Sequence, residues 1–218
     1  MRVYGRFVKS DNLVYPNFTS NNRCDASELS KIEKNWPRFC GIDYGGGGTS
    51  HPSAIVFIAV KPDFSVGYVY KAWRGDGQLT TANDVVEKYL EMREDEHIWF
   101  TFYDFAAKDV GTIAERSGLP FMKAEKNHEI GEGVLNSVFK NKMLYIPYGE
   151  DFDKLSSELN NLSHQTSKIR ANDHLTDALR YGVCRIPWVY EAIKVAEAPK
   201  ELTEMDLRRG QYDKNEDR

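Results

Sequence analysis

The sequence has few cysteines and no long apolar run. Its three cysteines, Cys24, Cys40 and Cys184, are odd in number and lack a Cys-x-x-Cys spacing, which argues against a disulfide framework and a zinc knuckle. No apolar stretch approaches the roughly 20 residues that a membrane-spanning helix needs. The first residues also lack the apolar segment of a secretory signal. We therefore expect a protein of the reducing cytoplasm.

The sequence also has no excess of positively charged residues. The 29 Lys and Arg residues are outnumbered by 33 Asp and Glu residues, which gives a formal net charge of -4. Proteins that coat nucleic acid through bulk electrostatics are usually basic, so this mode of binding is disfavoured. A nuclease is compatible with the charge, because carboxylates that await a metal lower the net charge while a local basic strip can still face phosphates.

The length predicts one domain with peripheral segments. A chain of 218 residues with 41% hydrophobic residues can bury one core and is too short for two full-sized domains. We predict an N-terminal extension packed on the domain at residues 1–36 and a core at residues 37–186. A C-terminal helix followed by a charged, mobile tail is predicted at residues 187–218.

The apolar pattern predicts an α/β fold. Segments 39–43, 53–61 and 65–74 read as three antiparallel strands, because β-branched and aromatic runs alternate with turn residues. The pattern then alternates, with helices at 81–94, 107–117, 131–141, 151–162, 172–184 and 188–196, and strands at 97–103, 121–124 and 143–146. This order predicts a mixed sheet, three antiparallel strands with parallel additions, flanked by helices on both faces.

Three acidic residues stand where this arrangement brings them to one edge of the sheet. Asp43 ends the first strand, Asp104 follows the strand at 97–103, and Asp177 lies near the start of the helix at 172–184. In such sheets polar ligands gather at strand ends. Alone, Asp43 also suits a turn and Asp104 a helix cap. Together, three convergent carboxylates repel one another unless a cation is present.

Carboxylate ligands predict a particular chemistry. Oxygen ligands suit Mg²⁺ or Mn²⁺, and two such ions about 3.5–4 Å apart can activate water and stabilise the leaving oxygen of a phosphodiester. We predict that Asp43, Asp104 and Asp177 hold two such cations and are catalytic. His174 is either a packing residue or a direct participant. Asp173 is either the N-cap of the helix or a residue that contacts the metal ligands without binding the metal itself.

The motifs also resemble those of a known family. Gly-Ile-Asp-Tyr-Gly at 41–45, Tyr-Asp at 103–104 and Asp-His-Leu-Thr-Asp-Ala-Leu-Arg-Tyr at 173–181 occur in the order found in the nuclease domain of tailed-bacteriophage large terminase subunits. The resemblance covers roughly residues 5–187, and the last motif is its most specific part. It implies a ribonuclease-H-like fold.

The resemblance implies a function for the site. In that family the acids at the positions of Asp43, Asp104 and Asp177 bind two metal ions, and some members use a histidine at the position of His174. It implies cleavage of double-stranded viral DNA during genome packaging in the host cell cytoplasm. The implied partners are an ATPase motor domain, the small terminase subunit and the portal.

One part of the family pattern is missing. A complete large terminase has a motor with a Gly-x-x-x-x-Gly-Lys-Ser/Thr phosphate-binding loop, and this sequence contains none. We therefore expect an excised nuclease domain or a processed half. The glycine run at 45–48 lacks the lysine, and we interpret it as a mobile turn rather than a phosphate contact.

Four lysines follow Asp104 in the sequence. We predict that they track DNA phosphates beside the metals, although ordinary solvated lysines have the same pattern. The four residues are Lys123, Lys126, Lys140 and Lys142.

Three other functions fit parts of the sequence. A junction resolvase or a transposase core would share the acidic site. An actin-like or sugar-kinase ATPase would use a similar glycine motif but needs two such domains, which 218 residues cannot supply. A non-catalytic DNA-docking or portal-docking module would be expected to lose at least one of the three acids, and none is missing.

Overall fold

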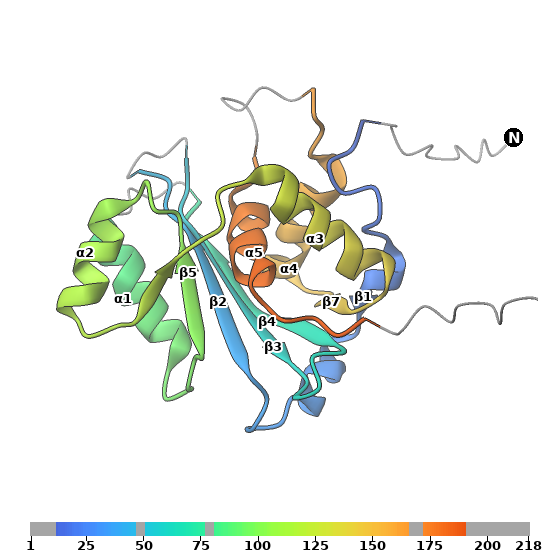
Figure 1. Cartoon of the computed structure of the whole chain (residues 1–218), viewed down its shortest axis with the longest axis horizontal. Coiled ribbons are helices and arrows are strands. Elements are labelled where there is room, and N and C mark those ends of the chain that lie inside the picture. Colours follow the sequence, from blue (N-terminus) through green and yellow to red (C-terminus); the bar gives the residue numbers. More distant parts are fainter. Residues whose placement is uncertain (1–11, 47–50, 77–80, 166–171, 191–218) are drawn as a thin grey trace, which may run out of the picture.

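A mixed β-sheet runs through the whole domain (Figure 1). The computed structural model describes residues 12–46, 51–76, 81–165 and 172–190. Within these residues the sheet has seven strands in the order β1-β7-β4-β3-β2-β5-β6. The strands are β1 (Arg23–Cys24), β2 (Arg38–Asp43), β3 (Ala54–Val60), β4 (Gly67–Arg74), β5 (Phe100–Tyr103), β6 (Phe121–Lys123) and β7 (Leu144–Pro147).

The strand directions confirm the predicted fold class. β3 pairs antiparallel with both β2 and β4, which makes the predicted antiparallel meander. β5 and β6 are then added parallel to β2, while β7 and β1 are added parallel to β4. Because β2 and β5 run parallel, their carboxyl ends lie at the same edge of the sheet.

Helices cover both faces of the sheet, as predicted (Figure 1). They are α1 (Ala82–Arg93), α2 (Lys108–Arg116), α3 (His128–Lys140), α4 (Glu150–Asn161) and α5 (His174–Cys184). β3 shows how the two faces form: Ile55 and Phe57 pack with α1 and α2, whereas Val56 and Ile58 pack with α3, α4 and α5. None of the helices in the described residues has the length and apolar composition to cross a membrane.

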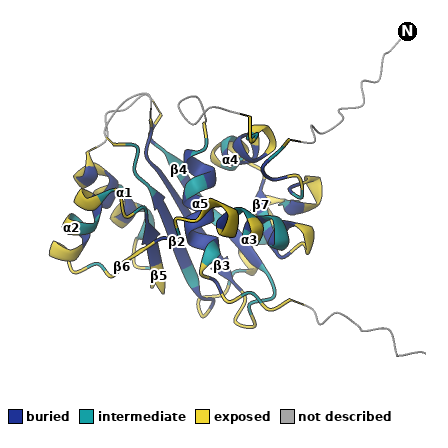
Figure 2. Cartoon of the chain, turned by 45° about the horizontal axis from the view of Figure 1, so that its top comes forward, coloured by how far each residue is buried: buried dark blue, intermediate teal, exposed yellow. Residues whose placement is uncertain are grey.

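The centre of the sheet is the most buried part of the domain (Figure 2). Every residue of β3 is fully buried, because helices cover it on both faces and strands flank it on both edges. This explains why its sequence is an unbroken apolar run instead of an alternating one.

The N-terminal segment contributes a strand that the sequence did not predict. Its two residues pair with the end of β7, so that β1 is the outermost strand on that side of the sheet. Two short 3-10 helices, η1 (Ser20–Asn22) and η2 (Ala26–Lys31), flank this strand. Phe18 is buried against Phe139 of α3, with 5.0 Å between the ring centroids. Such short elements have no periodicity from which they could be predicted.

The helix predicted at 188–196 is wrong where the structure describes it. Trp188, Val189 and Tyr190 are not helical, and the Val189 N–H donates to the Phe64 carbonyl in the β3–β4 turn. This bond joins the segment to the turn between β3 and β4. The rest of that segment and the predicted tail lie outside the described residues, as do Gly47 and Gly48 of the predicted glycine turn.

α5 packs backbone to backbone on β2. A Cβ atom at Gly41 would lie 1.8 Å from the Ala178 carbonyl oxygen of α5 and 2.8 Å from the Gly182 nitrogen. Since atoms cannot approach so closely, only glycine permits this contact. The contact brings the first turn of α5 to the carboxyl end of β2.

We expect Gly41→Ala to lower the free energy of unfolding by about 3 kcal/mol, the upper end of the usual cost of overpacking, because the new methyl group must push α5 away from the sheet. Chemical denaturation followed by circular dichroism measures this loss. The matched control is Gly133→Ala on α3, where an added Cβ meets no atom within 4 Å. The control should gain about 0.5–1 kcal/mol from helix propensity. Equal effects of the two variants would contradict the close-packing argument.

Candidate active site

The three predicted acids come from three elements that meet at one edge of the sheet. Asp43 is the last residue of β2, Asp104 follows β5, and Asp177 lies in the first turn of α5. β2 and β5 are neighbours with Ile42 opposite Tyr103, so the residues that follow this pair lie at the same level. The packing of α5 on β2 adds the third acid to this edge.

All three acids influence the pKa of Tyr181, a residue of α5. Burial raises the pKa of its hydroxyl, and the charges of Asp177, Asp43 and Asp104 raise it further. The side chain extends from α5, one turn beyond the third acid. All three predicted carboxylates therefore act electrostatically on one buried group.

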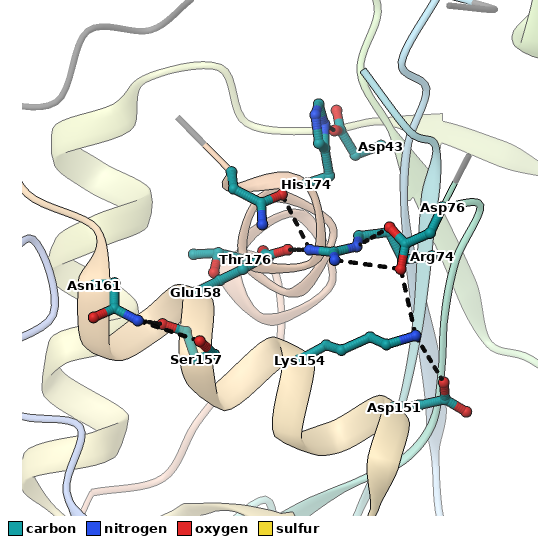
Figure 3. Close-up of polar contacts among 11 residues, drawn as sticks. Asp43, Arg74, Asp76, Asp151, Lys154, Ser157, Glu158, Asn161, His174 and Thr176 are labelled. Carbon is teal, nitrogen blue, oxygen red and sulfur yellow. Dashed lines mark hydrogen bonds and ion pairs between the residues drawn. The ribbon is translucent and has the colours of Figure 1, made fainter. Parts of the chain in front are cut away.

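Each acid contacts a different partner. Asp43 Oδ2 lies 2.8 Å from His174 Nδ1 (Figure 3). Asp104 Oδ1 lies 3.2 Å from the Lys126 ammonium. Among the residues that the structure describes, no three Asp, Glu, His or Cys side chains are arranged as a complete metal site. The acids share one edge of the sheet, but they are held as separate pairs.

The third acid has the most buried partner. Asp177 Oδ1 accepts from Nη2 and Nε of Arg180, at 2.9 and 3.2 Å. The Arg180 side chain is only 1% exposed, and its Cγ and Cδ atoms lie 2.7 Å from where a Cβ on Gly131 of α3 would be. This pair is therefore fixed by packing, unlike the pair of Asp104 with the half-exposed Lys126.

Burial makes Asp43 a carboxylate in need of a counter-charge. Its pKa is raised to about 6, because desolvation and the charge of Asp177 outweigh the hydrogen bond with His174, which lowers it. Burial alone would lower the pKa of His174, but the hydrogen bond and the charge of Asp43 outweigh it and raise that pKa. A divalent cation would compensate the buried negative charge, and the oxygen donors fit Mg²⁺ or Mn²⁺.

Asp173 occupies the N-cap position of α5, but its side chain makes no capping hydrogen bond. Burial raises its pKa, and the charge of Asp177 raises it further. The capping bond comes from another helix, because Glu158 of α4 accepts from the Thr176 N–H at 2.9 Å. Asp173 thus stands at the N-cap position without forming the side-chain cap that the sequence suggested as one alternative.

The structure separates the four predicted lysines into two pairs. Lys126 contacts Asp104, and the Lys123 ammonium lies 3.8 Å from the centroid of the neighbouring Phe105 ring. Lys140 and Lys142 lie at the far end of α3, a helix about 20 Å long, just before β7 begins at the opposite edge of the sheet. Only the first pair lies beside the acids.

Sequence reasoning missed several polar residues around the acids. Arg180 could have been found, since its spacing of three from Asp177 is that of a helical ion pair. The His51 and His174 rings lie nearly perpendicular to each other, with 5.8 Å between their centroids. The position of His51 follows only from the loop between β2 and β3. Glu158 had no signal in the sequence, because it is 16 residues before the first turn of α5.

Solved structures share this fold. A large terminase from a thermophilic bacteriophage, in complex with ATP-gamma-S, matches with a TM-score of 0.68 and 18% identity, over 86% of this chain and 48% of that one. The large terminase nuclease from the thermophilic phage G20c, with bound magnesium, matches with a TM-score of 0.57 and 13% identity, over 81% and 98%. The large terminase nuclease domain from bacteriophage SPP1, with bound Mn, matches with a TM-score of 0.52 and 17% identity, over 77% and 96%.

These matches confirm the resemblance to large terminase nuclease domains at the level of the fold. The chain spans about half the length of the terminase solved with ATP-gamma-S and nearly all of the two nuclease domains. No protein-family model matches the sequence, and no curated protein is similar to it.

Because the acids have different partners, replacing them should have different effects on the stability of the metal-free protein. Asp177→Asn should lower the free energy of unfolding by about 2 kcal/mol, less than the roughly 3–5 kcal/mol typical of a broken buried pair, because asparagine keeps one acceptor oxygen for Arg180. Asp43→Asn should cause no loss, since it removes a desolvated charge next to other acids. Denaturation in EDTA compares the two variants. A larger loss for Asp43→Asn would contradict this assignment.

Proposed function

We propose that the chain is the nuclease part of a bacteriophage large terminase and cleaves double-stranded viral DNA with two divalent cations during genome packaging. The convergence of Asp43, Asp104 and Asp177 at one edge of the sheet carries the proposal. The shared fold supports it, because two of the similar nucleases have bound magnesium or manganese.

The three acids would hold Mg²⁺ or Mn²⁺, which activate water and stabilise the leaving oxygen when bound. The protein's own residues have separate tasks. Arg180 keeps the Asp177 carboxylate oriented toward the site. The bond from Nδ1 to Asp43 fixes the His174 ring, so that this residue can hold a proton at Nε2.

Lys126 and Lys123 would provide the contact with DNA phosphates. Both lie beside Asp104, and the Lys126 side chain is 55% exposed. A cation that binds Asp104 would displace the Lys126 ammonium and leave it available for a phosphate. We propose no contact with the same phosphates for Lys140 and Lys142, because they lie at the far end of α3, just before β7.

The proposal includes partners and boundaries. The terminase solved with ATP-gamma-S is about twice as long as this chain. We propose that this nuclease likewise works with an ATPase motor, and with a small terminase subunit and a portal, in the host cytoplasm. The nuclease core would be residues 37–186, between an N-terminal extension and a C-terminal tail.

Supercoiled plasmid should be nicked and linearised in Mn²⁺ or Mg²⁺ and left intact in EDTA. Asp104→Asn should reduce the rate of cleavage by more than about 100-fold. Even residues that only hydrogen-bond to a metal ligand contribute about 10–100-fold to activity. Asp109→Asn is the matched control, because this exposed acid begins α2 close to the site without belonging to it. Gel electrophoresis over time gives the rates.

The outcomes separate the competing functions. A folded parent chain that cuts nothing with any metal would contradict the nuclease and favour a docking module. A strong preference for four-way junctions over plasmid would favour a resolvase.

Lys126→Gln should weaken DNA binding and reduce the salt dependence of the affinity by about one counterion, because one phosphate contact is lost. Lys140→Gln, which removes the same charge from the far end of α3, should change neither quantity. Fluorescence anisotropy with labelled duplex DNA in Ca²⁺ measures both. Equal losses in the two variants would show that DNA contacts extend to the opposite edge of the sheet.

A further inference from the structure

The first turn of α5 is held by a residue from another helix. This turn presents His174 and Asp177, yet the N-cap residue provides no side-chain acceptor for its free N–H groups. Glu158 Oε2 accepts from the Thr176 N–H at 2.9 Å instead (Figure 3). A carboxylate in this position also interacts favourably with the positive end of the helix dipole.

Arg74 fixes the other oxygen of the same carboxylate. Its Nη1 lies 2.5 Å from Glu158 Oε1 and donates to Asn172 Oδ1 at 3.0 Å, just before α5. Asp76 accepts from the Nε and Nη2 of the same guanidinium, and it also pairs with Lys154 of α4 (Figure 3). The network therefore joins the end of β4, the middle of α4 and the start of α5.

This pair differs from an ordinary surface ion pair. The Glu158 side chain is only 1% exposed and that of Arg74 is 13% exposed. Burial raises the pKa of Glu158 to about 7, against the opposing effects of the Thr176 N–H and Arg74. A carboxylate buried so deeply is costly unless both oxygens are engaged. The Thr176 N–H and Arg74 engage both, so the carboxylate is held in one orientation at the start of α5.

We propose that Glu158 is a positioning residue for the metal site: it fixes the first turn of α5 so that Asp177 and His174 stay in place opposite Asp43. Glu158 is not itself a ligand, because the Thr176 N–H and Arg74 already engage its two oxygens. The inference rests on the proposed function, since it concerns the same cations.

Glu158→Gln keeps the size of the side chain but only one acceptor oxygen. Either Arg74 or the Thr176 N–H then loses its acceptor, and the turn is free to shift. Residues that orient metal ligands typically contribute about 10–100-fold to metal affinity. We expect Glu158→Gln to weaken Mn²⁺ binding by about 10-fold.

Calorimetric titration of the full chain with Mn²⁺ tests this expectation. The matched control is Glu150→Gln, which removes a carboxylate from the exposed start of α4 and should keep the parent's affinity. Arg74→Lys is a second variant, since lysine keeps the charge but cannot bind Glu158, Asp76 and Asn172 together. Arg74→Lys should also weaken Mn²⁺ binding. If Glu158→Gln does not fold, the Mn²⁺ affinity of Arg74→Lys tests the positioning role in its place.

The titration separates this inference from the proposed function. Weaker Mn²⁺ binding in folded Glu158→Gln, with unchanged binding in Glu150→Gln, would support the positioning role. Parent-like affinity in the first variant, with only a lower melting temperature, would overturn it and leave a structural helix cap. Asp43→Asn is the reference for loss of the site. A parent chain that binds no Mn²⁺ would overturn the proposed function together with this inference.

Discussion

The contact between the α5 backbone and β2 at Gly41 determines the geometry of the site. Because the strand has no Cβ at this point, the helix lies directly against it, with the Ala178 carbonyl where a methyl group would otherwise be. Asp177 lies one residue before that carbonyl and thereby comes near Asp43 at the strand end. A larger residue in the strand would move the helix and separate the acids, whatever their own side chains could bind.

The acids at this edge differ in how readily they can exchange partners. Asp104 is paired with a half-exposed lysine, so a divalent cation would compete there against a weak and solvated interaction. Asp177 is paired with the buried Arg180, whose packing against α3 keeps it in place. In the proposed function, a cation would displace the lysine and leave the arginine, so that the Asp177 carboxylate would stay oriented while Asp104 changes its partner.

Features that depend on local pattern could be predicted from the sequence. The unbroken apolar run of β3 and the helical spacing of Val85, Val86 and Tyr89 each follow from burial of one segment against a core. The same reasoning placed Asp43 and Asp104 at strand ends. It failed for residues 188–190, which are not helical and bond to the β3–β4 turn, and for the two-residue β1, which is stabilised by β7.

By itself, the sequence determined which residues end the strands and which face of α5 is polar, because both follow from periodicity within one segment. Only the tertiary structure decided which of those residues meet. Lys126 and Lys140 look alike in sequence, but α3 carries them to opposite edges of the sheet. Glu158 reaches the first turn of α5 only because α4 packs beside it. Contacts between distant segments depend on how helices pack across the sheet, and no local sequence pattern encodes that packing.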